Sequence, residues 1–584
     1  MKRLYLDKTG WYRYTIIYKL PSWRGIAMAK RVFALLLSAL LLASCFACKK
    51  KAAEAPAPTE APAPTEAPTA APPEEWVIDD PLLKTDYAVA DNARVFYEIF
   101  VGSFADSDGD GIGDLRGIID RFDYLNDGDP NSGKSLGIEG IWLSPIFKSP
   151  SYHKYDVADY YEIDPDFGTQ ADLDELVALC HQRGVKLILD MVINHTARSN
   201  AWFGAFTKAH RQDIKDDPYY DFYTYYTQGE KAPAGRAFSA LSGTNIYYEC
   251  NFDGGMPELN FDNPAVREEV LKVSRYYLDR GIDGFRFDAA KYVYFGDHKK
   301  SEEFWQEYLT TLRSEYPGLY TVAEVWDPDA ITGIYYPATN CFNFTASGSE
   351  GRFATAAKQG NAGALTKYVE QYLKSIEGKN PDAMFVPFLA NHDTDRVAGY
   401  LTVESGYMQM AANMYILGPG SPFLYYGEEL GMRGSRGSAQ TDANRRLAMV
   451  WGDGDTTKDP EGTTYGRDKQ IQKGVKDQKA DEKSLYTYYK KLIMIRKANP
   501  AIARGEYKSV SIPDSKVGGF TATLDGNTVL VLHNPTKSAQ TIDLAKLGDF
   551  KTLRASIGLG SAQLTGVNGS SLTLDGQTSV VIGK

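Results

Sequence analysis

The chain has 584 residues, of which 43% are hydrophobic and 24% charged, so wholesale disorder is excluded. Its 64 Lys and Arg stand against 75 Asp and Glu, and the net charge of −11 argues against a nucleic acid as partner, because phosphate binding requires a basic surface. Five cysteines without the spacing of a small secreted domain exclude a disulfide framework.

The N-terminal segment has the features of an export signal. Lys30 and Arg31 precede an apolar run of only about a dozen residues, whereas a bilayer span needs roughly 20. The run ends in LASC, which resembles a bacterial lipobox whose cysteine, here Cys45, is acylated. We predict that residues 1–44 are a signal region, with Met28 as the true start of the protein. We also predict a protein anchored by lipid at the cell surface or the periplasmic side of a bacterial membrane. A plain cleaved signal with an incidental cysteine is the alternative.

A tether follows the signal region. Residues 45–76 repeat Ala, Pro, Thr and Glu and contain almost no large apolar side chain. Such a tract stays extended, close to polyproline II, at about 3 Å per residue. It is expected to hold the folded part away from a membrane and to carry no chemistry.

From Arg94 onward, short apolar runs that end in polar residues alternate with helical patterns. Residues 171–183 repeat apolar side chains at helical spacing, and Asn263-Pro264 has the residue types of a helix start. The expected strands are 94–104, 137–147, 185–195, 281–292, 320–326, 341–347, 384–393 and 420–429.

This α/β pattern favours a parallel (β/α)8 TIM barrel, because polar residues collect at the C-terminal end of strand after strand, where barrel active sites lie. The long Tyr-, Asp- and Gly-rich stretch after the third strand predicts an inserted domain B at 196–262. The barrel then comprises 77–195 and 263–498. Period-two alternation around Asp-Gly and Asn-Thr turns predicts a C-terminal antiparallel β-sandwich domain at 499–584.

Two strand ends carry residues suited to a pair of reacting carboxyl groups. Arg286 and Asp288 are two residues apart, so a strand places both on one face, where the guanidinium favours an ionised, nucleophilic carboxylate. Glu324 has apolar neighbours, which raise the pKa of a carboxyl group and suit a general acid.

Further polar residues end the third and seventh strands, namely His195 and the pair His392-Asp393. A single Asp at a strand end is more often a helix cap or an ion-pair partner. Three carboxylates and two histidines at one barrel end are costly to bury without a function. Cleavage of a glycosidic bond requires such an acid and nucleophile. A Ser-His or thiol mechanism and a zinc site find no support in the spacing.

These segments resemble the α-amylase family, glycoside hydrolase family 13. The matching motifs are DMVINH, GFRFDAAKY, AEVW and FLANHD, together with MPELN and GSPFLYYGEE. The resemblance implies a retaining mechanism with Asp288 as nucleophile, Glu324 as acid/base and Asp393 as stabiliser of the transition state. It also implies substrate contacts from His153, Tyr155, His195, Arg286, Lys291, Trp326 and His392.

The resemblance also bears on specificity. MPELN is similar to the intermediary group that contains exported bacterial α-amylases. Exo-acting oligo-1,6-glucosidases carry Asp-Asn-Gly before the stacking tyrosine, whereas this chain has Tyr152-His153-Lys154. An endo-acting α-1,4-glucan hydrolase of starch, amylose and maltooligosaccharides is therefore expected. Alternatives are a neopullulanase-like, α-glucosidase or transglycosylating member, and a surface glycan-binding protein that has lost catalysis.

An acidic loop after the first strand predicts a calcium site. It has the pattern D-x-D-x-D-G-x-x-D, in which alternating oxygen ligands and a glycine turn suit a hard cation. The twelfth position is Gly117 rather than Glu, which argues against an EF-hand, and an Asp/Gly-rich turn without an ion is the alternative. The resemblance adds a backbone carbonyl to the ligand set, which is Asp106, Asp108, Asp110, Ile112 and Asp114. A second site near Asn194 is left open.

Overall fold

The computed structural model describes residues 5–6, 12–13, 92–454 and 456–584. The predicted lipid attachment at Cys45 and the tether lie outside the described residues. The chain divides into one unit with residues 1–72 and 233–235 and a second with residues 73–232 and 236–584. In the first, the short strands β1 (Tyr5–Leu6) and β2 (Tyr12–Arg13) pair antiparallel. The second unit contains every other element.

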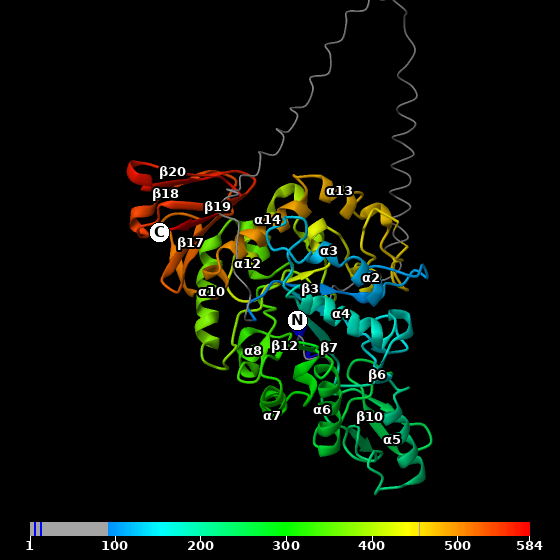
Figure 1. Cartoon of the computed structure of the whole chain (residues 1–584). Coiled ribbons are helices and arrows are strands. Elements are labelled where there is room, and N and C mark those ends of the chain that lie inside the picture. The colour runs from blue at the N-terminus through cyan, green and yellow to red at the C-terminus, as the bar shows by residue number, and fades with distance from the viewer. Residues whose placement is uncertain (1–4, 7–11, 14–91, 455) are drawn as a thin grey trace, which may run out of the picture. The chain divides into compact units, whose positions relative to one another are not determined.

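A parallel sheet with the strand order β13-β12-β11-β7-β4-β3-β14 forms the centre of this unit (Figure 1). Each strand lies inside one of the predicted apolar runs or overlaps it, but is shorter, so the polar residues at the run ends lie in loops. The strands are β3 (Phe96–Ile99), β4 (Gly140–Leu143), β7 (Lys186–Met191), β11 (Gly284–Phe287), β12 (Tyr320–Ala323), β13 (Asn340–Cys341) and β14 (Phe423–Tyr425).

The predicted strand at 384–393 is reduced to two isolated contacts. Val386 forms a parallel bridge with Phe342, just beyond β13, and Phe388 forms another with Phe423 in β14. These bridges join the two edges of the seven-stranded sheet through the segment 386–388. The fold is therefore TIM-barrel-like, with the seventh position held by an irregular segment.

Helices separate consecutive strands, as the sequence pattern predicts. In α4, Leu173, Leu176 and Cys180 are buried, and in α6 the Asn263 side chain accepts a hydrogen bond from the backbone N–H of Ala265. The helices are α2 (Leu115–Asp120), α3 (Phe122–Leu125), α4 (Gln170–Gln182), α6 (Pro264–Leu278), α7 (His298–Glu315), α8 (Asp329–Tyr335), α9 (Arg352–Gln359), α10 (Ala362–Ile376), α11 (Val397–Tyr400), α12 (Tyr407–Ile416), α13 (Val475–Ala480), α14 (Leu485–Ala498) and α15 (Ala501–Arg504).

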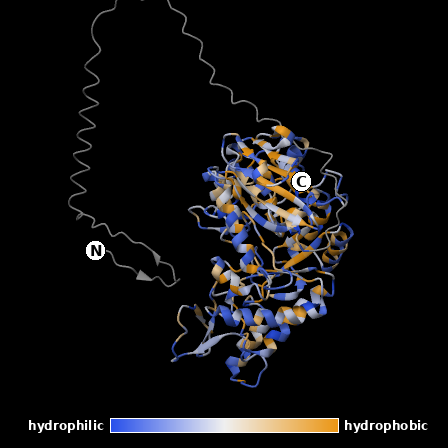
Figure 2. Cartoon of the chain, turned by 90° about the vertical axis from the view of Figure 1, so that its left-hand side faces the viewer, coloured by the Kyte–Doolittle hydropathy of each residue, from blue (hydrophilic) through white to orange (hydrophobic). Residues whose placement is uncertain are grey.

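Large apolar side chains fill the inside of the barrel. Inward-facing residues of successive strands form one buried cluster, which is a packed layer rather than a pore. Figure 2 shows the strands within the barrel as its strongly hydrophobic parts. The cluster consists of Phe96, Trp142, Ile188, Tyr320, Val322, Phe342, Val386, Phe388 and Phe423.

Between β7 and α6 the chain forms a small separate group of elements. Helix α5 (Ala201–Gln212) is followed by an antiparallel sheet in the order β8-β10-β9. Another short antiparallel pair, β5 and β6, lies between β4 and α4. The strands are β5 (Phe147–Lys148), β6 (Asp159–Ile163), β8 (Tyr225–Thr227), β9 (Phe238–Ala240) and β10 (Ile246–Glu249).

The C-terminal strands form two antiparallel sheets, β15-β16-β17-β22-β19 and β18-β21-β20 (orange to red in Figure 1). Leu530 and Ile582 from the first sheet and Leu572 from the second share one apolar core. In the described part of the chain, no helix has the length and apolarity of a membrane span. The strands are β15 (Glu506–Ser511), β16 (Gly518–Leu524), β17 (Asn527–Asn534), β18 (Gln540–Asp543), β19 (Thr552–Gly558), β20 (Ala562–Thr565), β21 (Ser571–Leu574) and β22 (Thr578–Gly583).

Candidate active site

Charged residues follow the apolar layer at the C-terminal ends of the barrel strands. Phe96 in β3 and Ile188 in β7 belong to the interior cluster, and Glu98 and Asp190 come two residues later. Because side chains alternate along a strand, these carboxyl groups point into the barrel above the apolar layer. The strand period therefore brings acidic groups from separate strands to one end of the barrel.

Arg286 joins three of these carboxyl groups. It is 1% exposed and lies beside Asp190 in the register of β11 and β7. Its Nη1 is 2.6 Å from Asp190 Oδ1 and 2.7 Å from Asp288 Oδ1, and its Nη2 is 2.8 Å from Glu324 Oε2. The backbone N–H of Ala289 also donates to Glu324 Oε2, at 3.1 Å. A single guanidinium thus connects the two candidate reacting groups.

The two candidate reacting groups have different proton affinities. Burial raises the pKa of Asp288 to about 6, against the lowering effect of Arg286. Burial raises the pKa of Glu324 to about 7, also against Arg286 and with a further upward contribution from Asp288. Near neutral pH, Asp288 is therefore mostly ionised and Glu324 is substantially protonated. This is the division that an acid and a nucleophile require.

A second charged group surrounds the third carboxylate, Asp393. Its Oδ2 is 3.1 Å from His392 Nε2 and its Oδ1 is 2.8 Å from Arg446 Nη2. Burial alone would raise the pKa of Asp393, but His392 and then Arg446 hold it well below its usual range. Asp393 is therefore ionised at any pH at which the protein would work.

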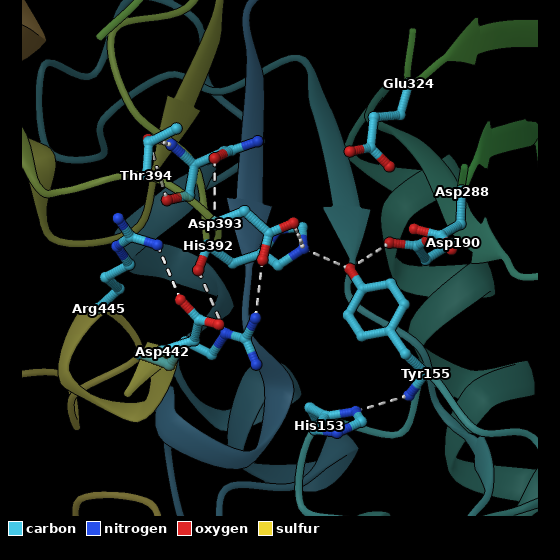
Figure 3. A network of polar contacts seen from close by, with 12 residues as sticks. His153, Tyr155, Asp190, Asp288, Glu324, His392, Asp393, Thr394, Asp442 and Arg445 are labelled. Carbon is cyan, nitrogen blue, oxygen red and sulfur yellow. Dashed lines mark hydrogen bonds and ion pairs between the residues drawn. The ribbon is translucent and has the colours of Figure 1, made fainter. Parts of the chain in front are cut away.

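Tyr155 connects the two groups, as Figure 3 shows. Its hydroxyl is 2.8 Å from Asp190 Oδ2 and 2.6 Å from His392 Nε2, and its ring stacks on His392 with centroids 5.3 Å apart. Burial raises the pKa of Tyr155 well above its usual range, so the hydroxyl keeps its proton. Tyr155 thus links Asp190 to His392, the partner of Asp393.

Two further histidines lie next to Tyr155. His195 Nε2 is 3.2 Å from the Tyr155 carbonyl, and His153 Nδ1 is 3.1 Å from the Tyr155 backbone nitrogen. Burial lowers the pKa of each histidine to about 4, so both are neutral at pH 7. They are suited to hydrogen bonding as neutral groups rather than to carrying a charge.

Lys291 and Trp326 lie at the edge of this region. Lys291 Nζ is 2.9 Å from the Trp326 carbonyl and 2.5 Å from Asp327 Oδ2. The Trp326 ring stacks on Phe344 with a centroid separation of 4.8 Å, and the residue is 47% exposed. The exposed part of this ring is therefore open to solvent.

Sequence reasoning missed two residues of this site, Glu98 and Arg446. Glu98 Oε1 is 2.6 Å from His392 Nδ1. A charged residue in the buried strand 96–99, at an inward position, is a signal that could have found it. Arg446 lies in a loop after β14 and no local pattern distinguishes it, so only the folded chain reveals its contact with Asp393.

The acidic loop brings three carboxylates together. One oxygen from each of Asp106, Asp108 and Asp114 lies within 4.8 Å of the others. All four Asp side chains of the loop also accept hydrogen bonds from backbone N–H groups, as Asp110 does from Ile112 at 2.7 Å. Burial would raise the pKa of Asp106, but hydrogen bonds from Thr456 and from the loop backbone hold it below its usual range. Carboxylate oxygens gathered this closely fit a hard cation.

Comparison with known proteins identifies the family. Residues 98–505 match the family model for the catalytic domain of α-amylase. The chain belongs to the α-amylase family. It is therefore a glycoside hydrolase family 13 enzyme, and its relatives include proteins named α-amylase and oligo-1,6-glucosidase.

Relatives in this family differ in named activity. The chain is 35% identical over 452 residues to α-amylase 3 of Dictyoglomus thermophilum, with 77% of this chain and 86% of the relative covered. It is 30% identical to an oligo-1,6-glucosidase of Parageobacillus thermoglucosidasius, over 75% of this chain and 89% of the relative. It is also 30% identical to a trehalose synthase/amylase of Mycobacterium tuberculosis, over 77% and 82%.

Solved structures show the same fold. The structure of Amy13B from Eubacterium rectale superimposes with a TM-score of 0.77 and 33% identity, covering 85% of this chain and 96% of that one. An α-amylase from H. orenii superimposes with a TM-score of 0.73 and 34% identity, covering 85% and 100%. These likenesses extend over the barrel and the C-terminal strands.

Proposed function

We propose that this family member is a retaining endo-acting α-1,4-glucan hydrolase, an α-amylase that degrades starch-like polysaccharides and maltooligosaccharides outside the cell. Asp288 attacks the anomeric carbon while Glu324 protonates the leaving oxygen, and Glu324 then activates the water that releases the sugar. Asp393 stabilises the positive charge that develops on the ring. The observation that carries this proposal is the shared contact of Asp288 and Glu324 with Arg286, with the higher pKa on Glu324.

The remaining site residues are assigned to sugar binding. Tyr155 supports the ring of the sugar at the cleavage point, and the neutral His153 and His195 bind its hydroxyl groups. Arg286 and His392 hold the carboxylates, while the exposed face of Trp326 and the ammonium of Lys291 contact the leaving part of the chain. The segment 196–262 is interpreted as the family's inserted domain B, which forms one side of the substrate cleft.

A second candidate is an α-glucosidase, neopullulanase-like or transglycosylating activity. It is favoured by the relatives at 30% identity that are named oligo-1,6-glucosidase and trehalose synthase/amylase. The endo-acting α-amylase activity is favoured by the 35% identity to an enzyme named α-amylase and by the sequence Tyr152-His153-Lys154. A glycan-binding protein without catalysis is disfavoured, because all three carboxylates are present and joined in one network.

Product analysis on soluble amylose and on pullulan separates these candidates. We expect a rapid loss of iodine staining from amylose and maltooligosaccharides of mixed length, released in the α-anomeric form. Glucose or panose as the first product would transfer the assignment to the second candidate. Amylose binding without turnover would establish a glycan-capture protein instead.

We also propose that the acidic loop binds Ca²⁺ through Asp106, Asp108 and Asp114, with the Ile112 carbonyl as a further ligand. Asp110 is a further proposed ligand, and like the other three carboxylates it also accepts a hydrogen bond from the loop backbone. When bound, the ion would tie the loop after β3 to the start of α2, where Asp114 caps the helix through the Gly117 backbone N–H. The ion takes no part in the reaction itself.

Calcium removal tests this site. Saturating Ca²⁺ at about 100 times its dissociation constant is expected to stabilise the fold by about 2.7 kcal/mol, and EDTA should lower Tm correspondingly. Asp106→Asn should abolish the difference. Asp123→Asn, which removes an exposed carboxylate paired with Arg183, should preserve it. Equal Tm values with Ca²⁺ and with EDTA would refute the calcium site.

We propose further that the protein is exported and lipid-anchored through Cys45, at the cell surface or the periplasmic side of a bacterial membrane. The support is the basic pair, the short apolar run and the LASC sequence. Mass spectrometry of the mature protein is expected to find a lipid-modified cysteine as the first residue. An unmodified N-terminus downstream of Cys45 would overturn the anchor.

A further inference from the structure

Glu98 is a buried carboxylate that the mechanism above does not use. It lies in β3 and is only 2% exposed. Its Oε1 is 2.6 Å from His392 Nδ1 and 3.3 Å from the His392 backbone nitrogen. Burying a carboxylate at this depth costs free energy unless the carboxylate is paired. Its partner here is His392, so Glu98 is expected to act on that residue.

The contacts of His392 favour a ring that carries a hydrogen on both nitrogens. Nδ1 faces Glu98, and a carboxylate only accepts, so Nδ1 carries a hydrogen. On the other side, Nε2 lies 2.6 Å from the Tyr155 hydroxyl and 3.1 Å from Asp393 Oδ2. The single hydroxyl hydrogen of Tyr155 is donated to Asp190. With Tyr155 donating to Asp190, Nε2 faces two acceptor oxygens, and a doubly protonated ring satisfies both sides of His392.

The charges around His392 also favour the doubly protonated ring. Burial lowers the pKa of the ring, but Asp393 and Glu98 outweigh burial and raise the pKa to about 10. Asp190 faces the ring through Tyr155. Two cations lie nearby: Arg446 shares Asp393 with His392 and donates to the His392 carbonyl, and Arg286 is paired with Asp190, Asp288 and Glu324.

We propose that Glu98 is a positioning residue that keeps His392 doubly protonated, and through that ring holds Asp393 and Tyr155 in the geometry that binds the reacting sugar. The inference rests on the proposed function of Asp393. The Glu98 carboxyl group contacts the ring and the backbone of His392, on the Nδ1 side of the ring, whereas Asp393 contacts Nε2, so Glu98 acts through the histidine.

The physical reason for a carboxylate at this position is charge balance. The reaction builds positive charge on the sugar ring, and an uncompensated imidazolium beside it would oppose that charge. Glu98 supplies a fixed negative charge on the side of His392 that faces away from Asp393. A glutamine would keep a hydrogen-bonding group of the same size but would remove this charge, so His392 would lose its proton much nearer its ordinary pKa.

Histidine NMR tests the protonation state without any substrate. The full protein, labelled with ¹⁵N-histidine, has seven histidines, and a His392→Gln variant identifies the signal of interest. We expect His392 to be an imidazolium at pH 8.5 in the wild type and neutral in Glu98→Gln. Glu98→Asp, which keeps the charge, should preserve the imidazolium. Glu139→Gln is the matched control, because Glu139 is also buried but bonds the Val95 backbone before the start of β3.

A neutral His392 in the wild type at pH 8.5 would overturn the proposal, and so would an imidazolium in Glu98→Gln. These outcomes do not depend on turnover, so they are distinguishable from a failure of the proposed function. If Glu98→Gln does not fold, a neutral His392 in the wild type would still overturn the proposal.

Kinetics then tests the link to Asp393. In Glu98→Gln, kcat/KM is expected to fall about ten- to hundredfold near neutral pH, the range for a lost hydrogen bond to a charged group. Above pH 7 it should decline with the loss of two protons rather than one, because His392 now titrates together with Glu324. Glu139→Gln should keep the one-proton slope. An unchanged slope in Glu98→Gln, with His392 neutral, would show that the histidine charge does not position Asp393.

Discussion

Replacing Asp288 by glycine is expected to lower kcat/KM on amylose by at least about 10³-fold, since loss of a nucleophile removes the covalent step and leaves only binding and electrostatic contributions. Asp288 is 2.7 Å from Arg286, which keeps its own contacts with Asp190 and Glu324. The rest of the network therefore survives the change. Initial rates of reducing-end release, with substrate binding measured in parallel, report the loss.

A small external nucleophile distinguishes a missing nucleophile from a damaged site. With α-maltosyl fluoride and sodium azide, Asp288→Gly is expected to form the β-maltosyl azide, because azide enters the space left by the carboxylate. Asp395→Asn is the control, since Asp395 is a partly exposed carboxylate paired with Arg445 close to the same site. Full activity in Asp288→Gly, or an α-configured azide product, would contradict the assignment.

Glu324→Gln is expected to abolish activity on amylose, by about 10²- to 10⁴-fold, and to remove the alkaline limb of the pH profile. In the wild type, kcat/KM should rise with pH as Asp288 ionises near 6 and should fall as Glu324 loses its proton near 7. The two apparent values belong to the coupled pair, so a narrow bell-shaped profile is expected. Protonated Glu324 is needed only where the leaving group requires a proton.

α-Maltosyl fluoride provides the matching measurement, because fluoride leaves without protonation. Glu324→Gln should retain much of the wild-type kcat/KM for fluoride release, and that rate should no longer fall above pH 7. The acidic limb near 6, which reports Asp288, should persist. Equal losses on amylose and on the fluoride would mean that Glu324 has a role other than that of general acid.

Helix positions were predicted well, because the spacing of apolar residues and the residue types of a helix start are local features of the sequence. The helix at 171–183 is confirmed as α4, with Cys180 buried in the core, and the helix start at Asn263-Pro264 is confirmed in α6. Strand lengths were overestimated, because apolar runs continue into the loops that carry polar residues. The run 384–393 forms only two bridges, since an apolar composition does not by itself require a regular hydrogen-bond ladder.

Some residues of the site were also predictable from local sequence, whereas others were not. Asp288, Glu324 and Asp393 were recognisable because each ends an apolar run, and period two placed Arg286 on the face of Asp288. Glu98 was missed because its partner, His392, is far away in the sequence. Arg446 was missed because it contacts His392 from an irregular loop. In the acidic loop, the spacing predicted four carboxylate ligands, and the structure brings oxygens of Asp106, Asp108 and Asp114 within 4.8 Å of one another, while the calcium site itself stays a prediction.

Local periodicity and short motifs are enough to predict the alternation of strands and helices, the family and the residue types at the strand ends. The protonation pattern, in contrast, depends on contacts between strands that are far apart in the sequence. The pKa values of Asp288, Glu324 and His392 depend on burial and on charges from other strands, and these distances arise when the barrel closes.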